Sequence, residues 1–554
     1  MPANVNLQTQ PFGNSIIFLA EADRMKAKIL FVLVSSVLIL ITAYSLSAAS
    51  ETRDKSAKVH GREAAFRSGL EADGFIVKNG STYPVDTITD LLDSGLGDTA
   101  NANNPGQPYK VLAVPPHPTD KDLPADLSEL PLSIFRIRPD EAIVYVGPTP
   151  PMGDYFSFTP YLWVRREGRI IAKGDFIFAA VNDPLNSAGI KTAGNGNPFH
   201  KQTVIIFTAD QGVYERVAAL AQAAGYPESM INSYIFPSEL LHLGVFSEYR
   251  NSDSFVLVVR TANFVSKAEG DRYLNNNSYA TVWRVTPERE PAPRPFPTPA
   301  PRQHKWISER TLFPDLENGL KRLKQAILRQ IPHVESESYE SIRWWPASRD
   351  VLEAEADPQS PIYHKFIAGE ASDTPYLRSA KDGKPANFIL GEDDLVVVYG
   401  VNHAATGLAT YSSLGVYGDW ITSSCDTPKN QFEYVFGCGD HIWNGVAGMN
   451  SHDFRGSAEQ YIPGDPMAPY LYAVKVTRRP PPDRHERFWV RVPEPPCEIP
   501  PCQAPLPSYN HGIELDKPVC IGYRAYLNPA TGAGPDYDDI IWDKAIWFKL
   551  KAKR

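Results

Sequence analysis

Two stretches of the chain, about 250 residues apart, share one pattern of acidic, apolar, glycine and aromatic residues. In Asp393–Gly418 and in Asp140–Trp163, an acidic pair precedes a short apolar run that ends at a glycine. A second glycine follows six or seven residues later, before a strand rich in Tyr and Ser. Short apolar runs divided by turn residues are typical of β-strands. The pattern therefore predicts two related β-rich halves.

The composition limits the classes of protein that this chain can belong to. At 554 residues it exceeds one ordinary core, so we expect several domains. Its 50 prolines argue against a mainly helical fold, because proline removes a backbone donor and breaks helix interiors. The net charge of -9 is spread along the chain without a basic face, so nucleic acid is not an expected partner.

The segment Arg24–Ser50 has the layout of an export signal. Basic residues precede an uncharged apolar run, Ile29–Leu46, and small residues follow it. A start at Met25 would make this a conventional signal peptide, and the protein is then secreted or periplasmic. The alternative is an uncleaved anchor, in which case the chain contacts a membrane only through residues 29–46.

The cysteines agree with an oxidising compartment. All five lie in the last third of the chain, where they are able to pair as disulfides: Cys425, Cys438, Cys497, Cys502 and Cys520. The connectivity stays open, and the odd count leaves one thiol over. A zinc site built on cysteine is disfavoured because no CxxC pair occurs.

We predict a mainly β fold with some α-helix, built from two related β-sandwich-like or jelly-roll-like halves. A small α/β element is expected inside the first half, where an apolar strand at Thr203–Thr208 precedes a helix capped by Asp210. The expected order is an export signal or anchor (1–50), a loop-rich lead-in (51–127), a first β-rich domain with the α/β insertion (128–286), a proline-rich linker (287–310), a helix and an irregular connector (311–387), and a second β-rich domain with disulfides (388–554).

Two segments around the domain boundary have distinct patterns. Pro287–Arg302 holds seven prolines and is expected to be an extended linker or strap. Asp315–Gln330 has leucines and an isoleucine at helical spacing and predicts an amphipathic helix that ends before Pro332. Its lysines and arginines are expected to form a solvated face.

No local motif of the common hydrolases, metalloproteases, nucleotide-binding proteins or c-type haem proteins occurs. The best candidate site is in the second half, where a His directly follows the Gly400 turn and a glycine-rich loop supplies more His and Asp residues. Imidazole, carboxylate and other polar groups suit proton transfer or a divalent metal. The catalytic candidates are Asn402, His403, His441, Arg455 and Tyr461, and the metal-ligand candidates are His441, His452 and Asp453. The alternative is that these are ordinary polar loop residues.

Aromatic residues support a competing hypothesis. Trp344 and Trp345 lie beside a proline in a segment expected to be irregular, and they are candidates for an exposed platform that stacks a ligand. Phe156 and Phe158 alternate along a strand and are expected in the core instead.

Two functions of different class remain open. One is an enzyme acting on an extracellular substrate such as a glycan, with its His/Asp site in the second half, and with a divalent metal as a candidate cofactor. The other is a non-catalytic extracellular or cell-surface binding protein with aromatic-lined grooves. The enzyme hypothesis requires His403, His441, His452 and Asp453 to converge on one cleft, since proton transfer and metal binding act at short range.

Overall fold

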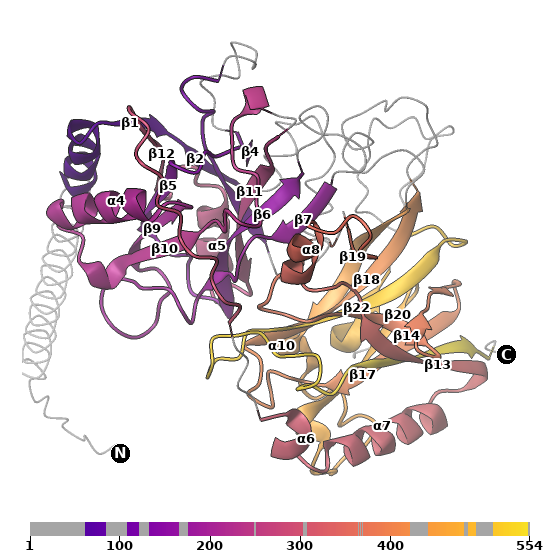
Figure 1. Cartoon of the computed structure of the whole chain (residues 1–554). Coiled ribbons are helices and arrows are strands. Elements are labelled where there is room, and N and C mark those ends of the chain that lie inside the picture. The colour runs from indigo at the N-terminus through magenta and orange to yellow at the C-terminus, as the bar shows by residue number, and fades with distance from the viewer. Residues whose placement is uncertain are drawn as a thin grey trace, which may run out of the picture. The chain divides into compact units, whose positions relative to one another are not determined.

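The computed structural model describes residues 61–84, 108–120, 132–165, 176–248, 251–302, 307–363, 365, 367, 369–421, 441–480, 486–492, 494 and 513–551. The chain divides into two compact units, Met1–Arg67 and Ser68–Arg554. The second unit is mainly β, as predicted, and its described residues form three sheets. Figure 1 shows its strands and the few helices that accompany them.

The first sheet contains the predicted α/β element. Its strand order is β1 (Phe75–Asn79), β12 (Thr281–Pro287), β5 (Ala142–Pro148), β9 (Gln202–Thr208) and β10 (Ile231–Ile235). β9 and β10 are parallel, and α4 (Gln211–Ala223) connects them. The Asp210 side chain accepts a hydrogen bond from the Val213 amide at 2.8 Å, and Gly225 has a positive φ of 92° just after the helix. The Asp210 cap and Gly225 thus lie at the two ends that the sequence predicted for this helix.

The second sheet shares a core with the first. Its main path is β2 (Ser81–Pro84), β3 (Tyr109–Ala113), β11 (Ser254–Ala262), β6 (Tyr155–Val164) and β7 (Phe176–Ala180), to which β4 (Ile134–Phe135) and β8 (Leu185–Asn186) add short pairings. Phe156 and Phe158 of β6 are fully buried in one cluster with Tyr145 and Phe207 of the first sheet. The core prediction for the two phenylalanines is confirmed.

The third sheet is the largest and is nearly closed into a barrel, since its end strands contact each other. Its path is β19 (His441–Asn450), β18 (Tyr411–Ile421), β22 (Pro518–Tyr526), β14 (Tyr376–Lys381), β13 (His333–Arg343), β23 (Lys544–Leu550), β17 (Asp394–Val401), β20 (Leu471–Thr477) and β21 (Trp489–Arg491), with β15 (Lys384–Pro385) and β16 (Phe388–Ile389) at its side. The short helices are α5 (Lys267–Leu274), α6 (Glu309–Leu312), α8 (Ser348–Ala354) and α10 (Ser451–Phe454).

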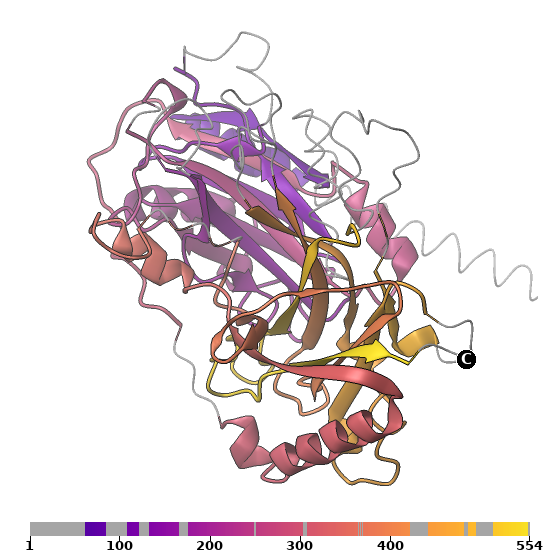
Figure 2. The same ribbon diagram turned by 90° about the vertical axis from the view of Figure 1, so that its right-hand side faces the viewer.

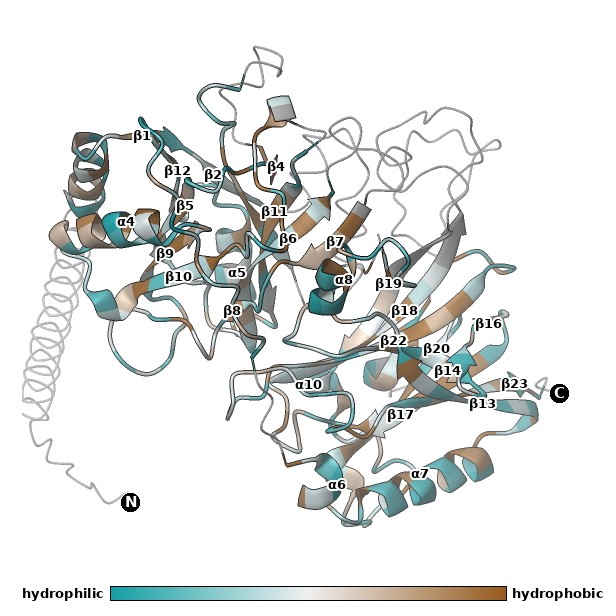
Figure 3. Cartoon of the chain, in the orientation of Figure 1, coloured by the Kyte–Doolittle hydropathy of each residue, from teal (hydrophilic) through white to brown (hydrophobic). Residues whose placement is uncertain are grey.

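β17 is buried on both faces, and its alternation separates two clusters. Val396 and Val398 belong to the core cluster enclosed by the nearly closed third sheet. Leu395 and Val397 lie on the other face, in one cluster with the predicted amphipathic helix, α7 (Leu316–Gln330). Figures 1 and 2 show α7 lying along the strands, and in Figure 3 most of its visible side is hydrophilic. The helix covers the outer face of the sheet with its apolar stripe.

The prediction of an irregular connector before residue 387 is wrong in part. β13 is an eleven-residue strand that pairs with β23 along its first part and with β14 along its last part, and α8 follows it. β13 was missed because its sequence, HVESESYESIR, has no apolar run, and only Tyr339 and Ser341 are buried. Val351 and Leu352 of α8 pack into the core between the first two sheets, so the connector belongs partly to the first half.

The relation between the two halves stays a prediction. β5 and β6, the strands of the first pattern, lie in different sheets, whereas β17 and β18, the strands of the second, lie in one sheet. Shared local sequence thus leads to different strand neighbours, and the sandwich-like or jelly-roll-like detail is not confirmed.

Pro287–Arg302 is a strap held along the first half. The Gln211 amide donates to the Arg294 carbonyl at 2.7 Å, and the Phe296 amide donates to the Ala209 carbonyl at 2.9 Å. The Asp210 carboxylate also accepts from the Arg294 amide at 2.6 Å. Backbone pairing on both sides of the α4 cap fixes the path of the strap.

The described residues test neither disulfides nor export. Cys520 is buried in β22, and Cys425, Cys438, Cys497 and Cys502 lie outside the described residues, as does the apolar segment at 29–46. Among the helices that the structure describes, none has the length and apolar character needed to cross a membrane.

Candidate functional site

His403 lies in a buried ion cluster rather than in a cleft. The turn after β17 brings its Nδ1 to 2.7 Å from Glu309 Oε1, and its Nε2 lies 3.8 Å from Asp543 Oδ2. Burial alone would lower the pKa of His403, but Glu309 and Asp543 outweigh it and raise the pKa to about 10. The imidazolium is therefore held between two carboxylates, with its side chain only 3% exposed.

The carboxylates of this cluster have further donors. Glu309 accepts from the Ile541 amide at 2.8 Å, and Asp543 accepts from the Tyr472 hydroxyl at 2.7 Å. The cluster thus ties α6, the β17 turn and the approach to β23 together. This arrangement suits a structural role, because the ring and both carboxylates are at most 7% exposed.

The other predicted site residues are dispersed. His452 is 62% exposed and pairs with Asp154 at 2.6 Å, and Asp453 is exposed beside it on α10. Asn402 donates to the Ser451 carbonyl at 3.3 Å, so it contacts the first residue of α10. Arg455 is exposed after α10, and Tyr461 is buried in the cluster that packs against α7. The structure brings Asn402 next to α10 but does not bring these residues into one cavity.

The metal hypothesis gains no support from the described side chains. No group of three or more His, Cys, Asp or Glu residues in that part of the chain could hold a metal ion. His441 is the first residue of β19, and its side chain lies outside the described residues.

Trp344 and Trp345 are half-buried rather than an open platform. Their rings stack with centroids 5.5 Å apart, and Trp344 packs edge-on against Tyr417 at 5.1 Å. Trp345 packs against the core between the first two sheets. The pair fastens the end of β13 to both neighbouring layers.

A different region has the geometry of a site. A cavity of about 310 Å³ opens where six segments meet: the end of β7, the end of the strap, the end of β13, the start of α8, the segment before β14, and the loop before β23. Most of its lining residues are of polar types, although apolar atoms form the larger part of its surface. The polar residues are Asn182, Asp183, Arg302, Arg343, Ser348, Arg349, Asp350, Glu370, Ser372, Thr374, Asp536 and Tyr537.

Glu370 is a buried carboxyl group among the residues that line this cavity. It is 4% exposed, and its carboxylate accepts a hydrogen bond from the Ser348 amide at 2.6 Å. Burial raises the pKa of Glu370 to about 7, although Ser348 and two arginines oppose the rise. A carboxyl group with this pKa can give or take a proton near neutral pH.

Asp373 connects Arg302, a lining residue of the cavity, to two neighbouring strands. Its carboxylate accepts from the Tyr155 hydroxyl at 2.9 Å and from the Asn186 amide at 2.9 and 3.0 Å, and it pairs with Arg302 at 3.3 Å. Burial raises the pKa of Asp373 to about 6, and Arg302 opposes the rise. Asp373 joins β6, β8 and the strap, so it positions the cavity wall.

Arg343 and Tyr537 also line the cavity and contact each other. The Arg343 guanidinium lies over the Tyr537 ring at 4.3 Å from its centroid, and its Nε donates to the Trp345 carbonyl at 3.0 Å. Tyr537 in turn accepts from the Tyr376 amide at 3.1 Å. Aromatic face, guanidinium, hydroxyl and carboxyl groups therefore surround one small space.

Sequence reasoning missed this site because its parts are far apart in the chain. Glu370 stands in a polar stretch, IAGEASDTPY, that matches no motif. Its burial depends on α8, the strap and the loop before β23, and none of these contacts leaves a local signal.

Comparison with known proteins adds no function. No protein-family model matches the chain, and no curated protein is similar to it. Among solved structures, the chain is similar to an uncharacterized protein from Burkholderia cenocepacia, with a TM-score of 0.33 and 12% identity over 91% of this chain and 90% of that one. It is also similar to the VPA0106 protein from Vibrio parahaemolyticus, with a TM-score of 0.32 and 11% identity over 89% of this chain and 100% of that one.

Proposed function

We propose that the protein is an enzyme that acts on a polyhydroxylated substrate such as a glycan, and that Glu370 is its general acid. The observation that carries the proposal is a buried carboxyl group with a pKa of about 7 among the residues that line a cavity. Strongly shifted carboxyl groups in clefts are enriched at catalytic sites.

The cavity lining suits sugar hydroxyls. Carboxylates accept hydrogen bonds from hydroxyl groups, amides both donate and accept them, and both kinds of group are among the lining residues. Its volume of about 310 Å³ is at the lower end of ligand sites, so it fits one or two sugar residues.

The chemistry needs a second carboxylate besides the acid. Protonated Glu370 would give its proton to the leaving oxygen of a glycosidic bond, and another carboxylate would activate water or stabilise the positive charge on the sugar. Asp350 and Asp536 line the same cavity and are exposed to water, so they are the candidates for this role.

Glu370, and not the sequence-predicted His403, has the acid/base role in this proposal. Both ring nitrogens of His403 face carboxylates inside the protein, and neither it nor His452 lines the cavity. The extracellular setting remains part of the proposal and is supported by the sequence of Arg24–Ser50 and by the number of cysteines.

The test is an assay of the full chain against a panel of oligosaccharides, comparing wild type with Glu370→Gln. Gln keeps the shape and an acceptor for Ser348 but cannot donate a proton as an acid. We expect kcat to fall about 10²–10⁴-fold. Glu335→Gln, an exposed residue on β13, is the matched control and should keep full activity.

Two outcomes would contradict the proposal. Glu370→Gln with unchanged kcat would remove Glu370 as the acid. Oligosaccharide binding by the wild-type chain without any turnover would favour the non-catalytic binding hypothesis instead.

A further inference from the structure

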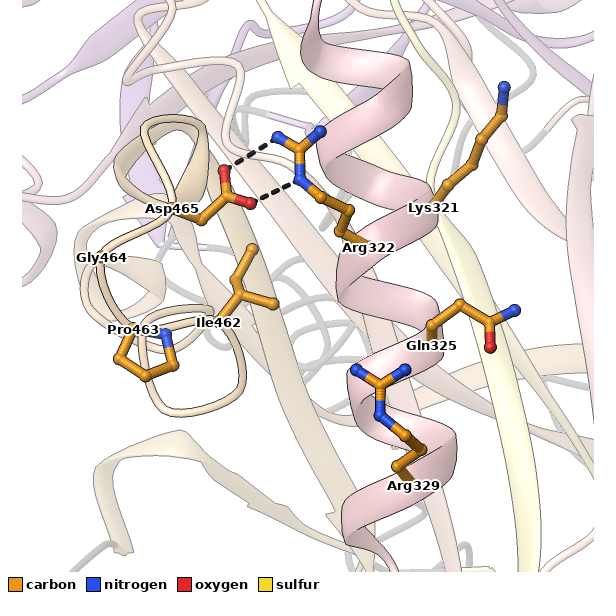
Figure 4. A pocket seen from close by; sticks show the side chains of 8 residues that line it. All are labelled: Lys321, Arg322, Gln325, Arg329, Ile462, Pro463, Gly464 and Asp465. Atoms are coloured by element: carbon orange, nitrogen blue, oxygen red, sulfur yellow. Dashed lines mark hydrogen bonds and ion pairs between the residues drawn. The ribbon is translucent and has the colours of Figure 1, made fainter.

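A second hollow lies on the other side of α7 from its apolar stripe. It is a groove of about 600 Å³ between α7 and the loop Ile462–Asp465, and Lys321, Arg322, Gln325 and Arg329 line its helical side. Figure 4 shows these side chains and the facing loop. It is larger than the cavity at Glu370 but more open.

One cation of the groove is already neutralised. Arg322 donates to both oxygens of Asp465, with Nη2 at 2.9 Å from Oδ1, and it also pairs with Asp315 at 3.0 Å. Gly464, with a positive φ of 78°, lets the loop turn toward the helix at this point. This bidentate contact fixes the loop against α7 and leaves Asp465 unavailable to other cations.

The remaining two cations have no such partner. Lys321 and Arg329 are exposed, and in the described part of the chain neither forms an ion pair. Their spacing of eight residues places them about 12 Å apart along the helix axis and about 80° apart around it. Gln325 lies between them, with an amide that can bind a hydroxyl group.

We propose that this groove binds a linear acidic glycan, with Lys321 and Arg329 contacting two anionic groups of one chain. Two separated cations fit an extended polyanion better than one small ion. A peptide would find few apolar pockets, since only Ile462 and Pro463 are apolar among the lining residues.

The test measures binding of a fluorescent tetragalacturonate to the full chain by anisotropy. We expect Lys321→Gln/Arg329→Gln to weaken binding at least tenfold and to flatten its salt dependence, because screened contacts between charges are lost. The matched control is Lys384→Gln/Arg491→Gln, which removes two exposed positive charges from β15 and β21 and should leave binding within twofold.

Three comparisons decide the outcome. A neutral oligosaccharide of equal length should bind at least tenfold more weakly than tetragalacturonate. Equal binding of oligoglutamate, or binding to vesicles of phosphatidylglycerol and phosphatidylcholine that the double variant abolishes, would overturn the glycan assignment. Unchanged tetragalacturonate binding by the double variant would overturn the site itself. The ligand would then be bound elsewhere, for example in the Glu370 cavity, which the double variant keeps.

Discussion

Two buried titratable groups, His403 and Glu370, differ in what surrounds them. The His403 cation is held between two carboxylates, those of Glu309 and Asp543. Glu370 is bound by the neutral Ser348 amide and lies in the wall of a cavity. The first environment favours the charged form of the group, and the second disfavours it.

This difference separates a structural group from a candidate catalytic one. A matched buried charge keeps its protonation state and holds segments together, so its pKa moves away from neutrality, to about 10 for His403. An unmatched buried carboxyl group moves toward neutrality, to about 7 for Glu370. A residue type that is common in active sites is therefore a weaker guide than the charges around it.

The largest expected effect on stability is at His403. His403→Gln would leave Glu309 and Asp543 buried without their shared cation, and we expect a loss of about 3–5 kcal/mol in the free energy of unfolding. The raised pKa means that the contribution of His403 is complete below about pH 6.5 and is lost as the pH rises through about 10. Urea unfolding at pH 6 and pH 10 checks both parts.

A loss under 1 kcal/mol for His403→Gln at pH 6 would break the comparison. His333→Gln is the control, because His333 is half-buried and its ring contacts a neutral backbone carbonyl, that of Ile331, at 2.7 Å. It should cost less than His403→Gln and show no comparable dependence on pH.

At pH 8, Glu370→Gln should change the free energy of unfolding in the opposite direction to His403→Gln. Unfolded Glu ionises near its usual pKa of 4.5, whereas folded Glu370 holds its proton up to about 7, so the stability of the wild type falls as the pH rises between these values. The difference between the two pKa values corresponds to about 3 kcal/mol. Glu370→Gln avoids this loss and should be more stable than wild type at pH 8, with the difference shrinking toward pH 4.

Unfolding curves of the two chains at pH 4, 6 and 8 test this expectation. Glu335→Gln should follow the wild type at all three pH values, because Glu335 is exposed in the structure. A Glu370→Gln variant that is less stable at pH 8 would mean that the carboxylate is matched after all, and the contrast with His403 would disappear.

Local patterns predicted local structure well. The helix α4, its Asp210 cap and the strand β9 follow from an apolar run and a capping residue within about 25 positions of sequence. The apolar stripe of α7 follows from helical spacing alone, and Leu316, Leu320, Leu323 and Ile327 are all buried. In each case the residues that decide the element are neighbours in the chain.

Structure that depends on distant partners was not predictable in the same way. β13 is mostly polar, and its place in the third sheet depends on β14 and β23, the second of which lies about 200 residues later. His403 resembled a catalytic residue because it follows a strand and a turn. Its partner Glu309 lies 94 positions earlier, and no sequence pattern connects the two.

The smallest expected effect is at His452, the exposed counterpart of His403. Its side chain is 62% exposed, and its only carboxylate partner in the described part of the chain is Asp154, at 2.6 Å. Solvent screens such pairs, so His452→Gln should change the free energy of unfolding by less than about 1 kcal/mol, and added salt should reduce even that. The same urea experiment measures it. A loss comparable to that of His403→Gln would show that burial is not what gives a His–carboxylate contact its weight in this protein, because both residues have a carboxylate at nearly the same distance.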